Sequence, residues 1–457
     1  MSRGGVGSTE PPPSGGAGFA GAGAGKLRIA NCSGFFGDRL SAARELVEGG
    51  PIDVLTGDWL AELTMGVLAK QRARDPEAGY APTFLVQLEQ VLGTCLERGI
   101  RIVSNAGGLN PRGCARAVEK LAERLGLAPR VACVTGDDAT ELLRQRRSEG
   151  WPAPHLDTGA PLEGEPLVAN AYLGCWGIVE ALEAGADVVI TGRVSDASVV
   201  VGPAAWRFGW AREDRDAFAG AVAAGHVIEC GAQATGGNFS FFQEVPGLER
   251  CGFPIAELAD DGSAVITKHP GTGGAVTVET VTAQLLYEID GPAYASPDVV
   301  ARFDTLTLEQ EALDRVRISG TRGEPASQQV KVGAILSGGW RNGITFGLTG
   351  LDVAAKAALA EETVWGAIAD ARPSTTSTFG CSAVRTPIPR ACTRRRRSST
   401  SSSPPPTGRS PIGSAVPQWR PCSPAIRASI SPHRPVGPPR SPFSGPRCSP
   451  PRTFRRK

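Results

Sequence analysis

Short apolar runs alternate with longer segments of helical periodicity through most of the chain. KLRIAN (26–31) precedes the helical pattern RLSAARELVEGG (39–50), and IRIVSN (100–105) precedes PRGCARAVEKLAERLG (111–126). Strands that alternate with helices indicate a largely parallel sheet flanked by helices. We therefore predict an α/β fold with an open three-layer sheet, and a barrel as the alternative. A smaller α+β part is expected near 300–350, where RVRISG and QVKVGAILSGG resemble antiparallel strands.

Seven strand-like runs are each followed by a loop rich in glycine and in small polar or charged residues. These loops are SGFFGDR (33–39), TGDWLAE (56–62), SNAGGLNP (104–111), TGDD (135–138), TGRVSDAS (191–198), GAQATGG (231–237) and KHPGTGG (268–274). Ligands of open parallel sheets and barrels bind at the carboxyl ends of the strands. If the runs are parallel neighbours, their loops meet at one edge, and we expect the functional site there.

Composition divides the chain into three parts. From Pro373 to Lys457 there are 15 Arg, one Lys, no acid and 18 of the 37 prolines, which leaves 32 basic and 46 acidic residues in 1–372. Such a segment cannot bury enough apolar surface to offset its chain entropy. We predict a disordered Gly/Ala/Pro leader over 1–25, one domain over 26–372, and a disordered basic tail over 373–457.

Three explanations account for the basic tail. It could be an arm that binds nucleic acid, an idle solvated tail, or the product of a reading-frame error. The third explains the sudden loss of acids best. Codons for Thr375–Cys381 can be chosen so that a shift of one base gives Asp-Asp-Val-Asp-Val-Arg-Leu, an ordinary strand-like segment. The tail is therefore set aside, and a nucleic-acid partner is not expected.

Targeting and cysteine patterns favour a cytoplasmic protein. The leader has no apolar segment behind a basic start, and no run approaches the roughly 20 apolar residues of a membrane span. The cysteines before residue 372 are isolated, without a CxxC pair. This pattern favours free thiols in a reducing compartment and predicts neither disulfides nor a metal site.

Two acid–arginine pairs are candidate reaction groups. In GFFGDR, Asp38 could transfer protons while Arg39 grips an anion, and in TGRVSDAS the same roles suit Asp196 and Arg193. The alternative for Asp38 is a helix cap, and for Asp196 a local ion pair with Arg193. Asp58 in TGDWLAE could likewise cap the helix that follows.

The segment GHVIEC supplies a further candidate. Taken as a strand, it places His226 and Glu229 on opposite faces, so the two would not share a metal ion. His226 is nevertheless an acid/base candidate, with a hydrogen-bonded structural histidine as the alternative. Gln233, in the loop that follows, is a candidate for substrate binding.

Two glycine-rich loops are candidate anion sites. Backbone amides of HPGTGG could bind a phosphate, including one of coenzyme A, although a tight strand-to-helix turn is the alternative. NAGGLN offers an asparagine and exposed amides that could stabilise an oxyanion or a carboxylate. The binding residues predicted in these loops are Asn105, Gly107, Gly108, His269, Gly271, Gly273 and Gly274.

Several of these motifs together resemble the acyclic terpene utilisation family (AtuA-like proteins). The resemblance rests on GFFGDR, DWLAELT, SNAGGLNPRG, TGRVSDAS with GPAAWRFGW, GHVIECGAQATGGNF, and KHPGTGG with QLLYEIDGPAYASPDV. It extends from about Lys26 to about Pro373. It implies a part in the bacterial catabolism of acyclic terpenes such as citronellol and geraniol, whose intermediates are acyl-CoA thioesters. It assigns no catalytic role to any residue.

Motifs and resemblance together lead to two functional expectations. The first is a lyase, hydratase or hydrolase that acts on a branched acyl-CoA or its acid, with a coenzyme A ester as the candidate substrate and no cofactor identified from the sequence. The second is a non-catalytic accessory subunit that binds an acyl-CoA or a partner enzyme. Either function is compatible with a homo-oligomer.

Overall fold

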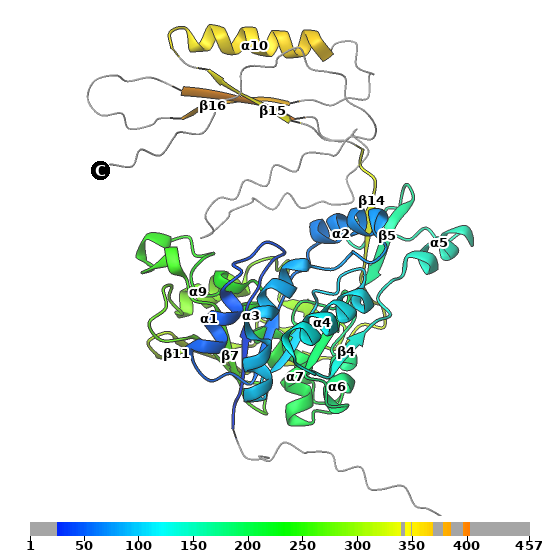
Figure 1. The fold of residues 1–457 in the computed structure, drawn as a ribbon, viewed down its shortest axis with the longest axis vertical. Helices are drawn as coiled ribbons and strands as arrows, with labels where there is room; N and C mark the ends of the chain where they lie inside the picture. Colours follow the sequence, from blue (N-terminus) through cyan, green and yellow to red (C-terminus); the bar gives the residue numbers. More distant parts are fainter. Residues whose placement is uncertain (1–24, 340–342, 349, 369–377, 385–395, 403–457) are drawn as a thin grey trace, which may run out of the picture. The chain divides into compact units, whose positions relative to one another are not determined.

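The computed structural model describes residues 25–339, 343–348, 350–368, 378–384 and 396–402. Two compact units contain them, and the boundary falls between Ser337 and Gly338. Within the first unit, the layers expected from the sequence are present (Figure 1).

A nine-stranded sheet forms the centre of the first unit. Its strands, in spatial order, are β11 (Thr307–Ala312), β12 (Arg315–Ser319), β8 (Ala264–Lys268), β7 (Pro254–Leu258), β1 (Leu27–Asn31), β2 (Val54–Gly57), β3 (Arg101–Ser104), β6 (Val188–Thr191) and β4 (Val131–Val134). From β1 to β4 all pairings are parallel, whereas β1, β7, β8, β12 and β11 pair antiparallel. The sheet has two edges and is open, which confirms the three-layer prediction over the barrel.

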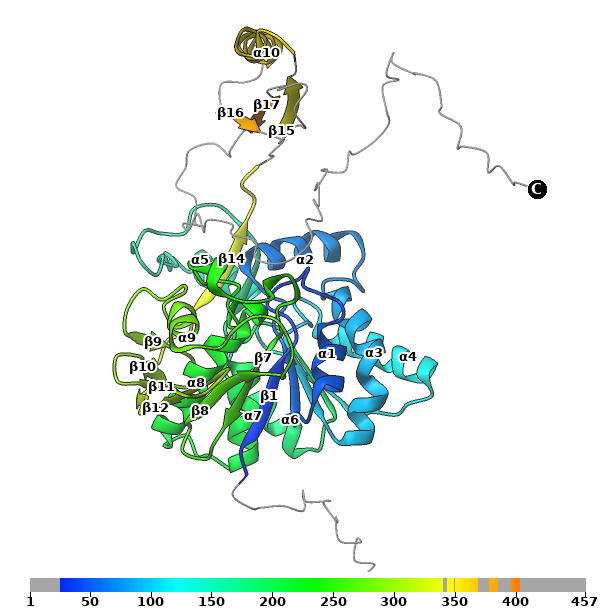
Figure 2. The ribbon, with the colours of Figure 1, turned by 90° about the vertical axis from the view of Figure 1, so that its left-hand side faces the viewer.

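Apolar side chains alternate between the two faces of this sheet, as its pleat requires. On one face, Ala30 and Leu55 pack against α1 (Ala42–Gly49), α3 (Pro82–Arg98) and α4 (Pro111–Leu125). On the other face, Ile29 and Val54 pack against α6 (Trp176–Glu183), α7 (Ser198–Phe208) and α8 (Arg215–Glu229). In Figure 2, α1, α3 and α4 lie to the right of the sheet. Each face therefore has its own core.

Helix α8 corrects one prediction. The segment GHVIEC was expected to be a strand, but residues 225–229 form the last turns of this helix. Every residue from Ala217 to Glu229 is buried. A helix that is apolar on all sides lacks the polar stripe by which periodicity separates a helix from a strand. Gly225 allows α8 to pack closely against Ala197, directly before α7, because a Cβ at position 225 would lie 2.9 Å from the Cβ of Ala197.

Smaller elements surround the main sheet. They are α2 (Glu62–Arg74), α5 (Thr140–Ser148), α9 (Val278–Leu285), the pair β5 (Pro166–Ala171) and β14 (Val332–Leu336), and the three-stranded sheet β13 (Arg322–Glu324), β10 (Val300–Arg302) and β9 (Ala293–Ala295). The strands expected between 305 and 345 exist but separate: RVRISG joins the main sheet as β12, whereas β14 pairs with β5.

The second unit contains a three-stranded antiparallel sheet and one helix. Its elements are β15 (Gly343–Leu348), β17 (Arg396–Ser402), β16 (Thr378–Val384) and α10 (Val353–Ile368). Two of these strands fall within the predicted tail, whose other residues, like the leader up to residue 24, lie outside the described chain. Of the helices described, none has both the length and the apolar character needed to cross a bilayer.

A buried carboxylate marks the point where the sheet changes from parallel to antiparallel pairing. Glu257 on β7 lies opposite Arg28 on β1 and forms an ion pair with it. Arg315 Nη2 lies 2.6 Å from Glu257 Oε2, and Lys26 Nζ lies 3.8 Å from the same oxygen. Burial alone would raise the pKa of Glu257, but the hydrogen bond from Arg315 and the nearby cations bring it below its ordinary value.

Glu257→Gln should lower the free energy of unfolding by about 1–3 kcal/mol, because two arginines lose a shared carboxylate. Because the pKa of Glu257 is lower in the folded protein, its stabilising effect is complete at pH values above its pKa in the unfolded chain. This effect disappears as the pH falls through its pKa in the folded protein. Urea unfolding at several pH values should show the wild type and the variant converging in acid. A stability gap that stays constant down to about pH 3 would contradict this account.

Candidate active site

The carboxyl ends of six strands lie at one edge of the main sheet. Strands β1, β2, β3, β6 and β4 are parallel, and β8 shares their direction because it pairs antiparallel with β7, which is itself antiparallel to β1. Helix α8 ends there too, since Asn31 Nδ2 at the end of β1 donates to the carbonyl oxygens of Ile228 (2.7 Å) and Glu229 (2.9 Å). All seven glycine-rich loops therefore lie at this edge.

A buried polar cluster, consisting of Asp58, Asn105, Arg193, Asp196 and Glu229, occupies the centre of this edge. Arg193 is only 3% exposed, and its Nη1 lies 2.8 Å from Asp196 Oδ1. Asn105 Nδ2 donates to Asp58 Oδ1 at 2.6 Å. The members come from the ends of β2, β3, β6 and α8, so the topology itself brings these distant residues together.

Burial and mutual repulsion change the acidity of this cluster. Burial, and then the charge of Asp196, raise the pKa of Asp58 well above its ordinary value, while Arg193 and Asn105 oppose the rise. Burial likewise raises the pKa of Glu229 well above its usual range. Both carboxyls therefore keep their protons at pH values where an ordinary carboxyl is ionised. Burial opposes the charge of Arg193, but neighbouring acids outweigh it and raise the pKa of this guanidinium.

Some polar atoms of the cluster have no partner in the described part of the protein. Arg193 Nε and Glu229 Oε2 are buried and form no hydrogen bond there. Buried donors and acceptors are normally satisfied, and leaving one unpaired costs roughly 1–3 kcal/mol. A donor and an acceptor of this kind in one cluster are what a site for a polar ligand would provide.

His226 lies one helical turn before Glu229, on the same side of α8. Its Nδ1 is 3.1 Å from Glu229 Oε1, and its ring packs against Tyr294 and Phe303 with centroid separations of 5.4 and 5.7 Å. The prediction that His226 and Glu229 face opposite ways was wrong, because the segment is helical. Burial lowers the pKa of His226, which favours its neutral form. No cluster of possible metal ligands occurs among the described residues.

The elements α2, β5 and β14 lie near one another in the first unit (Figure 1) and form a cover for the cluster. Tyr172, just after β5, places its ring 4.1 Å from the guanidinium carbon of Arg193 and donates its hydroxyl hydrogen to Glu62 Oε1 at 2.6 Å. The backbone N–H of Tyr172 donates to the carbonyl oxygen of Lys331, and Lys331 Nζ lies 4.6 Å from the ring centroid. The cover thus contacts Arg193, the cation of the cluster, through the ring of Tyr172.

Asp38 and Arg39 interact with groups outside the cluster. Asp38 accepts hydrogen bonds from the backbone N–H groups of Gly34 (2.9 Å) and Arg39 (2.7 Å). Burial raises the pKa of Asp38, and these hydrogen bonds oppose the rise. Arg39 donates to the carbonyl oxygen of Cys251 at 2.6 Å and pairs with Glu45 at 3.0 Å. In this structure both residues hold the first loop in place, and their predicted chemical roles stay predictions.

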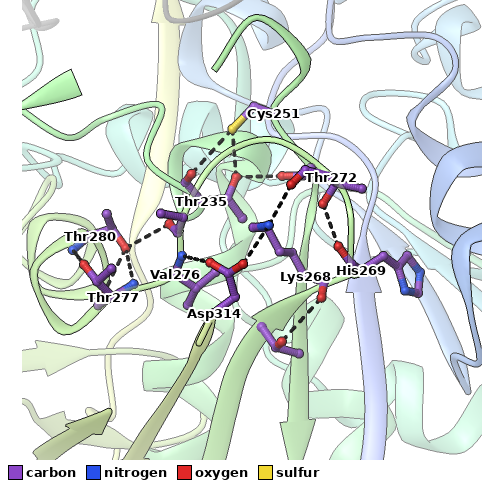
Figure 3. A network of polar contacts seen from close by, with 12 residues as sticks. Thr235, Cys251, Lys268, His269, Thr272, Val276, Thr277, Thr280 and Asp314 are labelled. Atoms are coloured by element: carbon purple, nitrogen blue, oxygen red, sulfur yellow. Dashed lines mark hydrogen bonds and ion pairs between the residues drawn. The ribbon is translucent and has the colours of Figure 1, made fainter. Parts of the chain in front are cut away.

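The loop HPGTGG is held by an extensive polar network (Figure 3). Lys268 Nζ donates to the carbonyl oxygen of Thr272 at 2.8 Å and pairs with Asp314 at 2.9 Å. His269 is buried with its Nε2 2.8 Å from the carbonyl oxygen of Leu46, and burial lowers its pKa. Helix α9 begins in a capping box of Thr277 and Thr280. The hydroxyl groups of these threonines therefore already accept backbone N–H groups of the first turn that a phosphate could otherwise bind.

Close packing explains several of the predicted glycines. A Cβ at Gly273 would lie 1.9 Å from the carbonyl oxygen of Gly247, and one at Gly107 would lie 2.4 Å from that of Thr191. Gly108, Gly271 and Gly274 have positive φ. These positions require glycine for the fold whether or not the loops bind an anion. Gln233 lies in a short 3₁₀ helix after α8, with its Oε1 buried and unpaired among the described residues.

Sequence reasoning gave too little weight to Asp58, Glu229 and Tyr172. Asp58 was considered as a helix cap, and it does accept the backbone N–H of Leu60 at 2.9 Å, but it also accepts from Asn105. Glu229 was placed on the wrong face. The alanine-rich run AFAGAVAA directly before GHVIE favours a helix, and continuing that helix to Glu229 would have shown the pairing of His226 with Glu229.

Comparison with known proteins yields one match. Residues 27–402 match a family model described as "Acyclic terpene utilisation family protein AtuA". No curated protein and no solved structure matches the chain. The match continues beyond Pro373, where the resemblance was expected to end, so its end does not coincide with the change in composition. A reading-frame error therefore stays a proposal that rests on the composition and the codon reading of the tail.

Glu229→Gln should change the pH dependence of stability. Because the pKa of Glu229 is higher in the folded state, the folded protein binds more protons between the unfolded value and the folded one. The free energy of unfolding of the wild type should therefore fall as pH rises through this interval. In the glutamine variant, which mimics the protonated form, the unfolding free energy should fall less steeply with pH. The difference in slope should correspond to the release of up to about one proton on unfolding. Identical slopes in urea titrations would contradict a protonated Glu229.

Proposed function

The chain belongs to the acyclic terpene utilisation family, and on this basis we propose that it is a cytoplasmic enzyme that transfers protons to and from a branched acyl substrate. The substrate is an α,β-unsaturated acyl-CoA thioester or its free acid, and the reaction is the addition or elimination of water. The observation that carries the proposal is the pair of buried, proton-retaining carboxyls, Asp58 and Glu229, beside the fixed cation Arg193.

In the direction of water addition, three side chains of the cluster have one task each. Arg193 holds the carbonyl or carboxylate oxygen of the substrate and stabilises the negative charge that develops on it. The carboxyl of Glu229 gives its proton to the α-carbon, while the oxygen of a water molecule bonds to the β-carbon. Asp196, the most exposed acid of the cluster, accepts the proton that this water loses. Proton return from Asp196 to Glu229 through solvent restores the site.

The environment of the cysteines disfavours a covalent thioesterase route. Burial raises the pKa of several thiols, and a thiol nucleophile must be ionised to react. The affected residues are Cys32, Cys95, Cys114, Cys175 and Cys230. Acid–base chemistry at the carboxyls needs no such ionisation, so hydration or dehydration is preferred to thiol-mediated hydrolysis.

His226 and Tyr172 support this reaction without contacting the reacting atoms. His226, in its neutral form, can donate to Glu229 and fix the orientation of that carboxyl. Tyr172 excludes water from one side of Arg193, which strengthens the cation's interaction with a bound oxygen. Both are positioning residues in the proposed site.

Glu229→Gln should lower kcat for hydration of a branched enoyl-CoA by about 10²- to 10⁴-fold and leave substrate affinity nearly unchanged. The loss arises because an amide cannot deliver the proton. Glu183→Gln, the same substitution at the exposed end of α6, is the matched control and should retain full activity. Product formation is followed by mass spectrometry, and affinity by thermal shift with the CoA ester and the free acid.

Two outcomes would contradict the proposal. Turnover by Glu229→Gln at the wild-type rate would remove this carboxyl from the reaction. Stabilisation of the wild-type chain by an acyl-CoA without any turnover would instead favour the accessory binding function.

A further inference from the structure

A cavity lies apart from the buried polar cluster. It is lined by the start of α6, the loop before α8, the first residues of α8, and the segments around Asp298 and Pro325. Its volume is about 230 Å³. Ligand pockets commonly measure about 300–1,000 Å³, so this cavity suits a small ligand or the end group of a larger one.

Aromatic side chains form one wall of the cavity. Trp176 and Phe218 pack with their centroids 5.7 Å apart, and Phe218 is buried, so the wall is fixed. The guanidinium carbon of Arg212 lies 4.1 Å from the centroid of the Trp176 ring. A guanidinium stacked on an aromatic ring keeps its N–H groups free in its own plane, and these match the two oxygens of a carboxylate or phosphate.

Two arginines and two acids line the cavity, and they differ in how far their charges are already paired. Arg212 and Arg215 both contribute to the lining, and no ion pair of either guanidinium occurs among the described residues. Of the two acids, Asp298 accepts the backbone N–H of Cys175 at 2.9 Å, and burial raises its pKa. The charge of Arg212 opposes this rise, so Asp298 and Glu213 are both opposing charges in the lining. The two arginines therefore keep N–H donors that no ion pair among the described residues uses and that a bound anion could take up.

We propose that this cavity is a binding site for a small ligand with a carboxylate or phosphate group, which Arg212 and Arg215 hold while its apolar part lies on Trp176. The site is separate from the buried polar cluster in residues and in chemistry, because it has two surface cations and no pair of buried acids. Two of its lining residues nevertheless lie close in sequence to residues that belong to the cover of that cluster. Trp176 follows Tyr172 along the chain, and Pro325 precedes Lys331.

Binding of two probes to the full-length protein tests this proposal. Inorganic phosphate and 3-methylbutanoate are titrated separately by calorimetry, with tryptophan fluorescence as a second signal because Trp176 lines the site. Saturable binding of either probe is expected. The stronger probe identifies the natural group as a phosphate or a carboxylate, and both results support an oxyanion site.

Charge variants give the decisive comparison. Arg212→Gln should weaken binding about 10-fold or more, since one charge-assisted pair is lost. Glu213→Gln, the matched control with the opposite charge, should strengthen binding by about two- to fivefold. Arg215→Gln gives a second test of the basic pair if Arg212→Gln lowers the melting temperature.

Three results would overturn the proposal: no saturable binding of either probe by the wild type up to about 10 mM, unchanged affinity in both arginine variants, or weaker binding in Glu213→Gln. Binding is assigned to this cavity by its dependence on Arg212, Arg215 and Glu213, none of which belongs to the buried polar cluster. Failure here is therefore distinct from failure of the proposed catalytic site.

Discussion

A single buried cation organises the functional edge of this protein. Arg193 is almost completely removed from water, and a guanidinium in that position is tolerable only when opposite charge and hydrogen-bond acceptors surround it. Asp196 supplies the charge, and Tyr172 supplies the face of an aromatic ring. The surrounding acids then experience both burial and the cation, and the balance between these two effects determines which of them keeps its proton.

The need of the buried Arg193 for neighbouring partners also links the cover to the acidity of the cluster. Tyr172 contacts Arg193 on one side and bonds through its hydroxyl group to Glu62 at the start of α2. A movement of α2 or of the β5–β14 pair would therefore change the surroundings of the cation. Water would then reach the cluster, and the burial that raises the pKa of Asp58 and Glu229 would decrease. Access to the cluster and its acidity are consequently coupled.

The sequence was sufficient to predict the architecture and the edge of the sheet at which the candidate site lies. It did not predict how the side chains are arranged at that edge. Alternating strands and helices with polar loops after the strands led correctly to an open sheet with its loops at one edge. Arg193, Asn105 and Asp196 were identified because each lies in a loop that follows a strand. Glu229 was missed because α8 is apolar on all sides, and its buried carboxyl has no local signal in a segment that also resembles a strand. Likewise, the glycine pattern of HPGTGG could not reveal that Gly273 packs against Gly247, a contact between segments distant in sequence.

Strand β14 has a consequence for synthesis of the protein on the ribosome. It is the last element of the first unit, and it completes the cover only by pairing with β5, whose residues are made much earlier. Until Val332–Leu336 leave the exit tunnel, β5 presents an unsatisfied strand edge, and a nascent chain with such an edge is prone to pair with a neighbour. A transcript truncated just upstream of this strand would thus encode the whole nine-stranded sheet together with an unpaired β5, a natural substrate for chaperones and proteases.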